Sequence, residues 1–191
     1  MNAWTSFWSA MRAYVANDDP LVETGNFVAM IVAWNQPFYP LYVYWSAGTV
    51  EPSFYTFLST PFFLAVPAVA RRWPVAGRIL LVLAGIGNTM VSAKAFGVAS
   101  GVEAFFLPCV TLAFLLFGPS QRWISYGLAG LAFLAYFALH GRYGAPAHLY
   151  SAAEYSALFT LNFLSVFTLT ALLGILASGL IAKKSHSAPT R

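Results

Sequence analysis

The stretch from Lys94 to Gly118 reads K-A-F-G-V-A-S-G-V-E-A-F-F-L-P-C-V-T-L-A-F-L-L-F-G, and the rest of the chain is organised around it. Apolar segments flank it on both sides. It contains Glu103, the one carboxylate that falls well inside such a segment, five residues before Pro108. An ionised carboxylate is costly in hydrocarbon, so we expect Glu103 to face the interior of a helix bundle or the outer interface and to have a partner.

The composition places the chain among membrane proteins, with the lipid bilayer as its first partner. Of 191 residues, 59% are hydrophobic and only 8% are charged, whereas a soluble domain carries about 25% charged residues. The length fits roughly six spans of about 20 residues each. The net charge of +4 comes from basic residues that mostly flank apolar runs. This arrangement indicates a positive-inside bias and gives no reason to expect a nucleic-acid partner.

Six apolar segments predict an all-α membrane protein, a bundle of six transmembrane helices. Their ranges are 25–47, 53–70, 75–95, 100–117, 122–140 and 154–182. We expect three parts: an N-terminal amphipathic interfacial helix over 1–20, the six-helix domain over 21–183, and a short cytoplasmic tail over 184–191. The interfacial helix is predicted because large apolar residues recur at three- and four-residue steps. They are Trp4, Phe7, Trp8, Met11 and Val15.

The basic residues predict the orientation. Eight of the ten fall on one side of a six-span topology: Arg12, Arg71, Arg72, Arg78, Arg122, Lys183, Lys184 and Arg191. Only Lys94 and Arg142 fall on the other side. Because basic loops stay in the cytoplasm, we expect a multi-pass protein of the cell inner membrane with both termini cytoplasmic.

The first segment contains a helix break. Pro37 and Pro40 follow Asn35 and Gln36 near its middle, and each proline removes a backbone donor and clashes with the preceding turn. Carbonyl groups freed in this way need partners in hydrocarbon. Broken helices mark binding sites in some membrane proteins, and elsewhere they are kinks satisfied by neighbouring side chains.

Two further amides, Asn88 and Asn162, lie within the third and sixth segments. Amides inside a membrane commonly hydrogen-bond between helices, and the same groups serve as polar contacts for a bound molecule. A ligand-binding site built from the polar residues of the spans would consist of Asn35, Gln36, Asn88, Glu103 and Asn162.

Glu103 has two interpretations. Lys94 is the nearest basic residue, and a Lys94–Glu103 ion pair would tie two helix ends together. Alternatively, Glu103 contacts a ligand that enters from outside. A separate, weaker hypothesis is a site for a divalent metal ion in the loop region. Its ligands would be two histidines and a carboxylate: His140, His148 and Glu154. Their spacing matches no standard metal motif.

A set of short runs carries a family resemblance. It consists of Asn88, the run G-V-A-S-G-V-E-A-F-F-L-P from Gly97 to Pro108, an apolar stretch ending near Arg122, and the run L-N-F-L-S-V-F-T-L from Leu161 to Leu169. In these runs the chain resembles the six-helix membrane sensor region that precedes some bacterial class III adenylate cyclases and histidine kinases. The resemblance implies a sensor that signals to a cytoplasmic output domain.

The chain departs from that group in two respects. Histidine is often found there at the position of Glu103, and this chain ends eight residues after Lys183. We therefore expect a free-standing relative that signals through a separate subunit.

The expected function is ligand or partner binding without catalysis. A mostly apolar pocket on the external half would take a small apolar or amphipathic ligand. The alternatives are the substrate-binding membrane component of a small-molecule transporter, with a separate transport subunit, an accessory subunit of a membrane complex, and an intramembrane metalloenzyme. No catalytic residue is predicted, and no cofactor other than the metal ion of the weaker hypothesis.

Overall fold

The computed structural model describes residues 3–186, and the side chains of residues 5–182. Every regular element in this part of the chain is helical, so the predicted all-α class is confirmed. The elements are α1 (Ala3–Val15), α2 (Pro20–Asn35), η1 (Gln36–Phe38), α3 (Tyr39–Ala47), η2 (Glu51–Ser59), α4 (Thr60–Arg72), α5 (Pro74–Phe96), η3 (Val98–Ser100), η4 (Val102–Phe105), α6 (Phe106–Leu115), η5 (Pro119–Gln121), α7 (Arg122–Leu139) and α8 (Ala152–His186).

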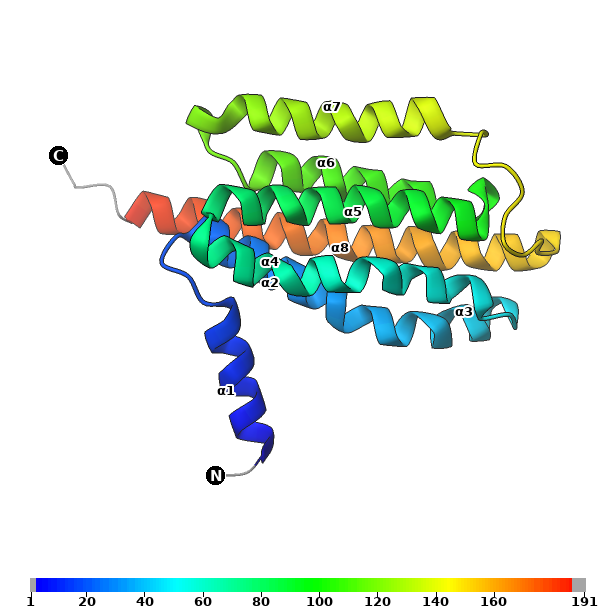
Figure 1. Ribbon diagram of the computed structural model, residues 1–191, viewed down its shortest axis with the longest axis horizontal. Coiled ribbons are helices and arrows are strands. Elements are labelled where there is room, and N and C mark those ends of the chain that lie inside the picture. Colours follow the sequence, from blue (N-terminus) through cyan, green and yellow to red (C-terminus); the bar gives the residue numbers. More distant parts are fainter. Residues whose placement is uncertain (1–2, 187–191) are drawn as a thin grey trace.

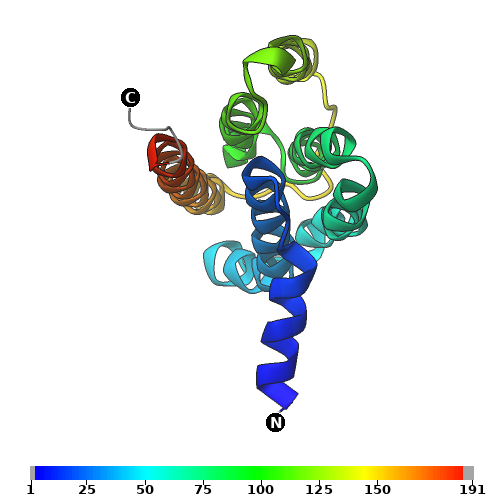
Figure 2. The ribbon, with the colours of Figure 1, turned by 90° about the vertical axis from the view of Figure 1, so that its left-hand side faces the viewer.

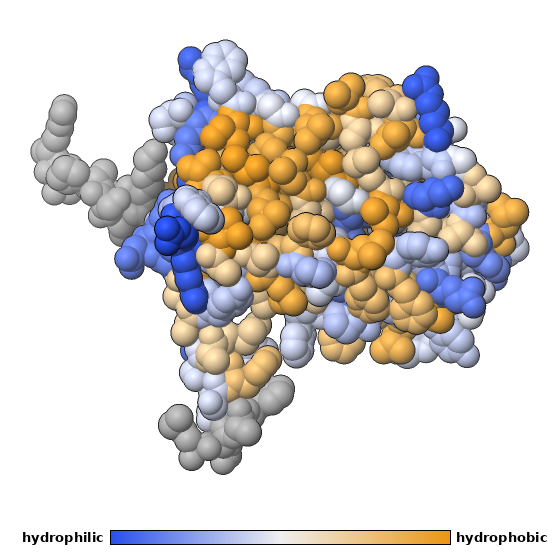
Figure 3. Space-filling model, viewed as in Figure 1, coloured by the Kyte–Doolittle hydropathy of each residue, from blue (hydrophilic) through white to orange (hydrophobic). Residues whose placement is uncertain are grey.

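The helices from α2 to α8 run side by side in one bundle (Figure 1). Four of them are long and apolar enough to cross a membrane: Glu51–Arg72, Pro74–Phe96, Pro119–Leu139 and Ala152–Ala182. The other two predicted segments fall short of this criterion. The predicted segment 25–47 is broken at η1. In the predicted segment 100–117, the apolar helix covers only Val102–Leu115. On the face that Figure 3 shows, the surface between the two ends of the bundle is largely apolar.

Two apolar clusters hold the bundle together. The larger one joins α2, α4, α5, α6 and α7, with Phe63, Leu81 and Leu116 among its buried side chains. The smaller one closes the end where α3 and α5 finish and α8 begins; it contains Val43, Ala47, Ala95, Phe96, Tyr150 and Leu158.

Helix α1 extends away from the bundle (Figures 1 and 2). Its C-terminal turn is attached to α4, because Tyr14 Oη donates to the Leu64 carbonyl at 2.7 Å and the Arg71 guanidinium donates to the Ala13 and Tyr14 carbonyls. The exposed rings of Phe7 and Trp8 lie on the predicted apolar face, whereas the Trp4 side chain lies outside the described residues. The interfacial placement of α1 stays a prediction.

The basic residues gather at one end of the bundle because the helices alternate in direction. Arg71 and Arg72 end α4, Arg78 lies in the second turn of α5, and Arg122 begins α7. We call this the basic end, and we call the opposite end, which carries residues 140–151, the loop end. The predicted tail begins inside α8, which continues through His186, and the part at 187–191 lies outside the described residues.

Arg78 differs from the other basic residues because it is buried. Its side chain is 4% exposed, and Nη1 donates to the Leu116 carbonyl at 2.7 Å. The last carbonyls of a helix lack intrahelical donors and carry partial negative charge. Arg78 therefore caps the C-terminus of α6.

Candidate functional site

A cavity of about 1490 Å³ lies between α2, α5, α6 and α8, and we call it the central cavity. Its wall is mostly apolar. Residues of the wall include Phe27, Met30 and Ile31 of α2, Leu81, Gly85 and Asn88 of α5, Pro108, Cys109 and Leu112 of α6, and Leu161, Leu169, Leu172 and Leu176 of α8.

The cavity exists because α8 packs unevenly along its length. Near its beginning, Leu158 and Asn162 are fully buried: Leu158 belongs to the smaller apolar cluster, and Asn162 bonds Tyr39 of α3 and Ser100 of η3. Toward its C-terminus, Leu173 is buried but Ile175 and Ile181 are each 70% exposed. In the view along the helices, α8 stands at the side of the bundle, next to α6 (Figure 2). Helix α8 therefore forms one wall of the cavity without filling it.

The cavity extends over most of the length of the bundle. It reaches Tyr42 and Phe105 on the half nearer the loop end, and Glu23 and Arg12 at the basic end. Beyond it, the smaller apolar cluster packs the loop end with Phe96, Tyr150 and Leu158. The pocket that the sequence places on the external half stays a prediction.

The predicted helix break is confirmed, and the Gln36 side chain lies at it. Helix α2 ends at Asn35, η1 follows, and α3 begins at Tyr39. The buried Gln36 side chain donates to the Thr56 carbonyl at 2.9 Å and to Ser59 Oγ at 2.7 Å, and it accepts from Thr60 Oγ1 at 2.6 Å. This amide joins the break to η2 and α4.

Asn88 extends this polar cluster to the cavity. Its Oδ1 accepts from Ser59 Oγ at 2.8 Å. Among the described residues, no hydrogen bond occupies the other atom of the Asn88 amide, and Asn88 lines the cavity wall. Asn35 also lines the cavity, with an exposed side chain. The cavity thus has an available amide group in a mostly apolar surface.

Asn162 serves as a connection between helices. It is 0% exposed, accepts from Tyr39 Oη at 2.8 Å, and donates to the Ser100 carbonyl at 2.9 Å. Both ends of its amide are therefore used within the protein, and it is not part of the cavity wall. This is the helix-joining role that intramembrane amides commonly have.

Glu103 lies at the loop end, outside the central cavity. Its side chain is 7% exposed, and Oε2 contacts His140 Nδ1 at 2.6 Å. Lys94 instead donates to the Ala145 carbonyl at 2.7 Å, so the predicted Lys94–Glu103 pair is not formed. Lys94 is held by the loop, and His140, at the end of α7, is brought to Glu103 by the packing of α6 on α7.

The other carboxylate oxygen, Glu103 Oε1, is buried and has no hydrogen-bond partner within the described residues. The same is true of the neighbouring Tyr143 Oη. Burial, together with the neighbouring Glu103 carboxylate, raises the pKa of Tyr143 to about 12. The phenol therefore stays protonated at neutral pH and remains a potential donor. The two atoms are close enough to influence each other electrostatically.

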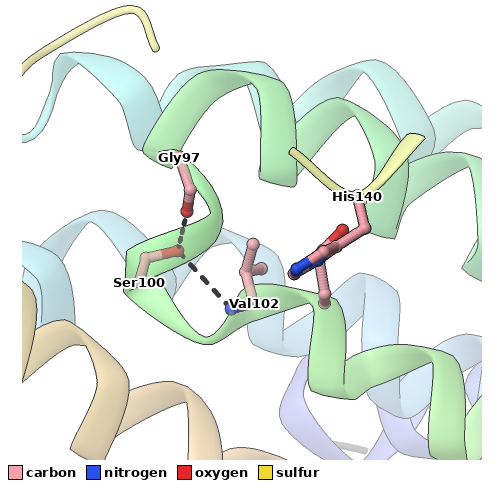
Figure 4. Close-up of polar contacts among 5 residues, drawn as sticks. Gly97, Ser100, Val102 and His140 are labelled. Atoms are coloured by element: carbon pink, nitrogen blue, oxygen red, sulfur yellow. Dashed lines mark hydrogen bonds and ion pairs between the residues drawn. The ribbon is translucent and has the colours of Figure 1, made fainter. Parts of the chain in front are cut away.

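A glycine-flanked turn positions Glu103. Ser100 Oγ donates to the Gly97 carbonyl at 2.7 Å and lies 3.4 Å from the Val102 amide, which donates to it. Figure 4 shows this turn with His140 beside the following segment. Gly101 has a φ of 73°, a conformation that glycine adopts without steric cost.

The three residues of the metal hypothesis are not brought together. His140 pairs with Glu103, the His148 ring lies edge-on to Tyr150 at 4.7 Å, and Glu154 accepts from the Ser151 amide at 2.7 Å. Within the described part of the chain, no three His, Cys, Asp or Glu side chains are placed to hold a metal ion.

We expect His140→Ala to lower the free energy of unfolding by about 1–3 kcal/mol, because it leaves a buried carboxylate without its partner. The measurement is thermal unfolding in detergent, followed by a thiol-reactive dye on the buried Cys109. His148→Ala is the matched control and should change the free energy by less than about 0.5 kcal/mol. Glu103→Gln combined with His140→Ala should recover part of the loss; equal stability of His140→Ala and the parent chain would contradict the pairing.

One protein-family comparison gives a match: the MASE7 family model covers residues 23–180. Comparisons with curated proteins and with solved structures give no significant match. The match extends from the second turn of α2 to the last part of α8 and so includes the whole bundle. It confirms the predicted resemblance to a membrane sensor region.

Proposed function

Because the chain belongs to the MASE7 family, a membrane-associated sensor domain family, we propose that it senses a lipophilic molecule held in the central cavity. The proposed sensor is a six-span protein of the inner membrane with both termini cytoplasmic. The six helical segments from α2 to α8 alternate in direction, and their basic residues lie at one end, which is the arrangement that the positive-inside rule associates with the cytoplasm.

The observation that carries the proposal is the cavity itself. Ordinary small-molecule pockets measure about 300–1,000 Å³, so a cavity of about 1490 Å³ suits a larger, lipid-like occupant. Its wall is apolar, and the Asn88 amide supplies one hydrogen-bonding group near the middle of the bundle. A few placed polar groups in an apolar wall give orientation and selectivity to binding.

Helix α8 is the element that would report occupancy. It forms one wall of the cavity, and its C-terminal half has few contacts with the other helices. A ligand that binds better to one position of α8 shifts the population toward that position. Because α8 continues through His186 at the basic end, the shift would reach the cytoplasmic side, where a signalling subunit or output domain would detect it.

The test is mass spectrometry of molecules retained after extraction in mild detergent. Leu172→Trp fills the cavity from α8 and should remove most of the retained molecule, whereas Ile181→Trp, on an exposed part of α8 outside the cavity wall, should not. Asn88→Leu removes one hydrogen bond and should weaken binding by about 3–10-fold. Equal retention in all three variants would exclude the cavity as the binding site.

The same preparation distinguishes the alternative functions. A transport component should co-purify with an ATPase subunit, and an accessory subunit should co-purify with its membrane complex. A sensor should retain its ligand when neither an ATPase subunit nor a membrane complex co-purifies with it.

A further inference from the structure

The length of the central cavity and the residues at its basic end indicate what kind of molecule fits it. Its wall on α8 extends from Leu161 to Leu180, which corresponds to about 29 Å of helix. Half of the hydrocarbon core of a bilayer measures about 15 Å. The cavity is therefore long enough for the acyl chains of a lipid from one leaflet.

Arg12 lies at the end of the cavity near α1, with Trp8 and Met11. Among the side chains that the structure describes, it is the only basic one in the cavity wall, and it also lines an adjoining hollow of about 360 Å³ with Thr5, Trp8 and Ser9. Its side chain is exposed, and within the described residues it makes no hydrogen bond or ion pair. A guanidinium in this state is available to a ligand.

Charges of both signs surround this position. Arg71, which also attaches to the end of α1, donates to the Ala13 and Tyr14 carbonyl groups, and these contacts leave its positive charge uncancelled. Carboxylates are supplied by Asp18 and Asp19, which follow α1, and by Glu23 of the cavity wall. Arginine binds phosphate through two parallel N–H groups.

We propose that the cavity binds an anionic phospholipid of the inner leaflet, with its acyl chains between α2 and α8 and its phosphate at Arg12. This inference rests on the proposed function and adds the chemical class of the ligand. The apolar wall accounts for the chains, and the guanidinium of Arg12 accounts for the headgroup. A zwitterionic lipid such as phosphatidylcholine would fill the cavity equally well, but its own choline balances the charge of its phosphate, so its interaction with Arg12 would be weaker.

The experiment reconstitutes the full chain in phosphatidylcholine nanodiscs that contain a minor share of phosphatidylglycerol. After transfer to a zwitterionic detergent, native mass spectrometry measures which lipid remains bound. The parent chain should retain phosphatidylglycerol in preference to phosphatidylcholine. Arg12→Gln should reduce this preference by about fivefold, the effect of one basic residue near an anionic membrane surface.

Arg122→Gln is the matched control, because it removes the same charge at the same end, outside the cavity wall. It should leave the preference unchanged. An equal effect of both variants would overturn the assignment of the headgroup to Arg12, as would equal retention of the two lipids by the parent chain. Preferred retention of added oleate over phosphatidylglycerol would also overturn it, in favour of a single-chain carboxylate.

The result separates the two proposals. If the cavity binds lipid without charge selection, Leu172→Trp still removes the bound lipid while Arg12→Gln has no effect, and only the further inference fails. If no lipid is retained by any variant, the proposed function fails with it.

Discussion

Gly101→Ala is expected to lower the free energy of unfolding by about 2–5 kcal/mol, through a backbone cost of about 1–2 and an overpacking cost of about 1–3. Gly101 has a φ of +73°, which a residue with a Cβ adopts only under strain. An added Cβ would also lie 2.6 Å from Cδ2 of Phe159 on α8. Either the Phe159 ring or the turn must shift to make room for it.

The measurement is thermal unfolding followed by the reactivity of Cys109, which is buried in the folded chain. Gly141→Ala separates the two costs, since Gly141 has a φ of +70° but nothing within 4 Å of the added Cβ. It should lose only about 1–2 kcal/mol. Phe159→Ala combined with Gly101→Ala should recover part of the overpacking cost. Equal losses for the two glycine variants would show that the contact with Phe159 is unimportant.

This turn matters for the loop end as a whole. Ser100, directly before Gly101, provides the carbonyl that binds Asn162, and Glu103 follows two residues later. A displaced turn would therefore loosen the attachment of α8 and the Glu103–His140 pair together. In the Gly101→Ala variant, His140→Ala should then cost less than it does in the parent chain, because interacting sites are not additive.

Gly77→Ala is expected to destabilise the fold by about 1–3 kcal/mol, because the added carbon meets backbone that cannot move independently. The new Cβ would lie 2.5 Å from Cβ, 2.7 Å from Cα and 2.8 Å from N of Ala70. Helices α4 and α5 are in direct contact here, and they would have to separate. The same thermal unfolding measurement checks the effect.

Gly87→Ala is the matched control on the same helix. An added Cβ there meets nothing within 4 Å, and replacing a glycine inside a helix by alanine is favourable by about 0.5–1 kcal/mol. The two variants should therefore change stability in opposite directions. A neutral Gly77→Ala variant would show that α4 and α5 adjust freely at this contact.

The sequence allowed the positions of the helices and their alternation to be predicted. Apolar runs and basic connections are properties of short stretches, and so are the prolines that separate α2 from α3 at Gln36. The sequence pattern predicts six spans, and four helices of the described residues are long and apolar enough to be spans. The broken first segment and the short α6 do not reach the length of a span on their own, although both occupy places in the bundle.

By itself, then, the sequence determined the helical class, the membrane environment, the break at Gln36 and the separation of basic residues to one end. Only the tertiary structure decided which side chains meet. Glu103 pairs with His140, 37 residues away, instead of with Lys94, and Arg78 caps α6 instead of facing solvent. It also decided that the central cavity extends along most of the bundle and that Asn162 is closed off from it. The reason is physical: local sequence sets where a helix begins and ends, whereas partners and cavities depend on how each helix is rotated and how closely it approaches its neighbours.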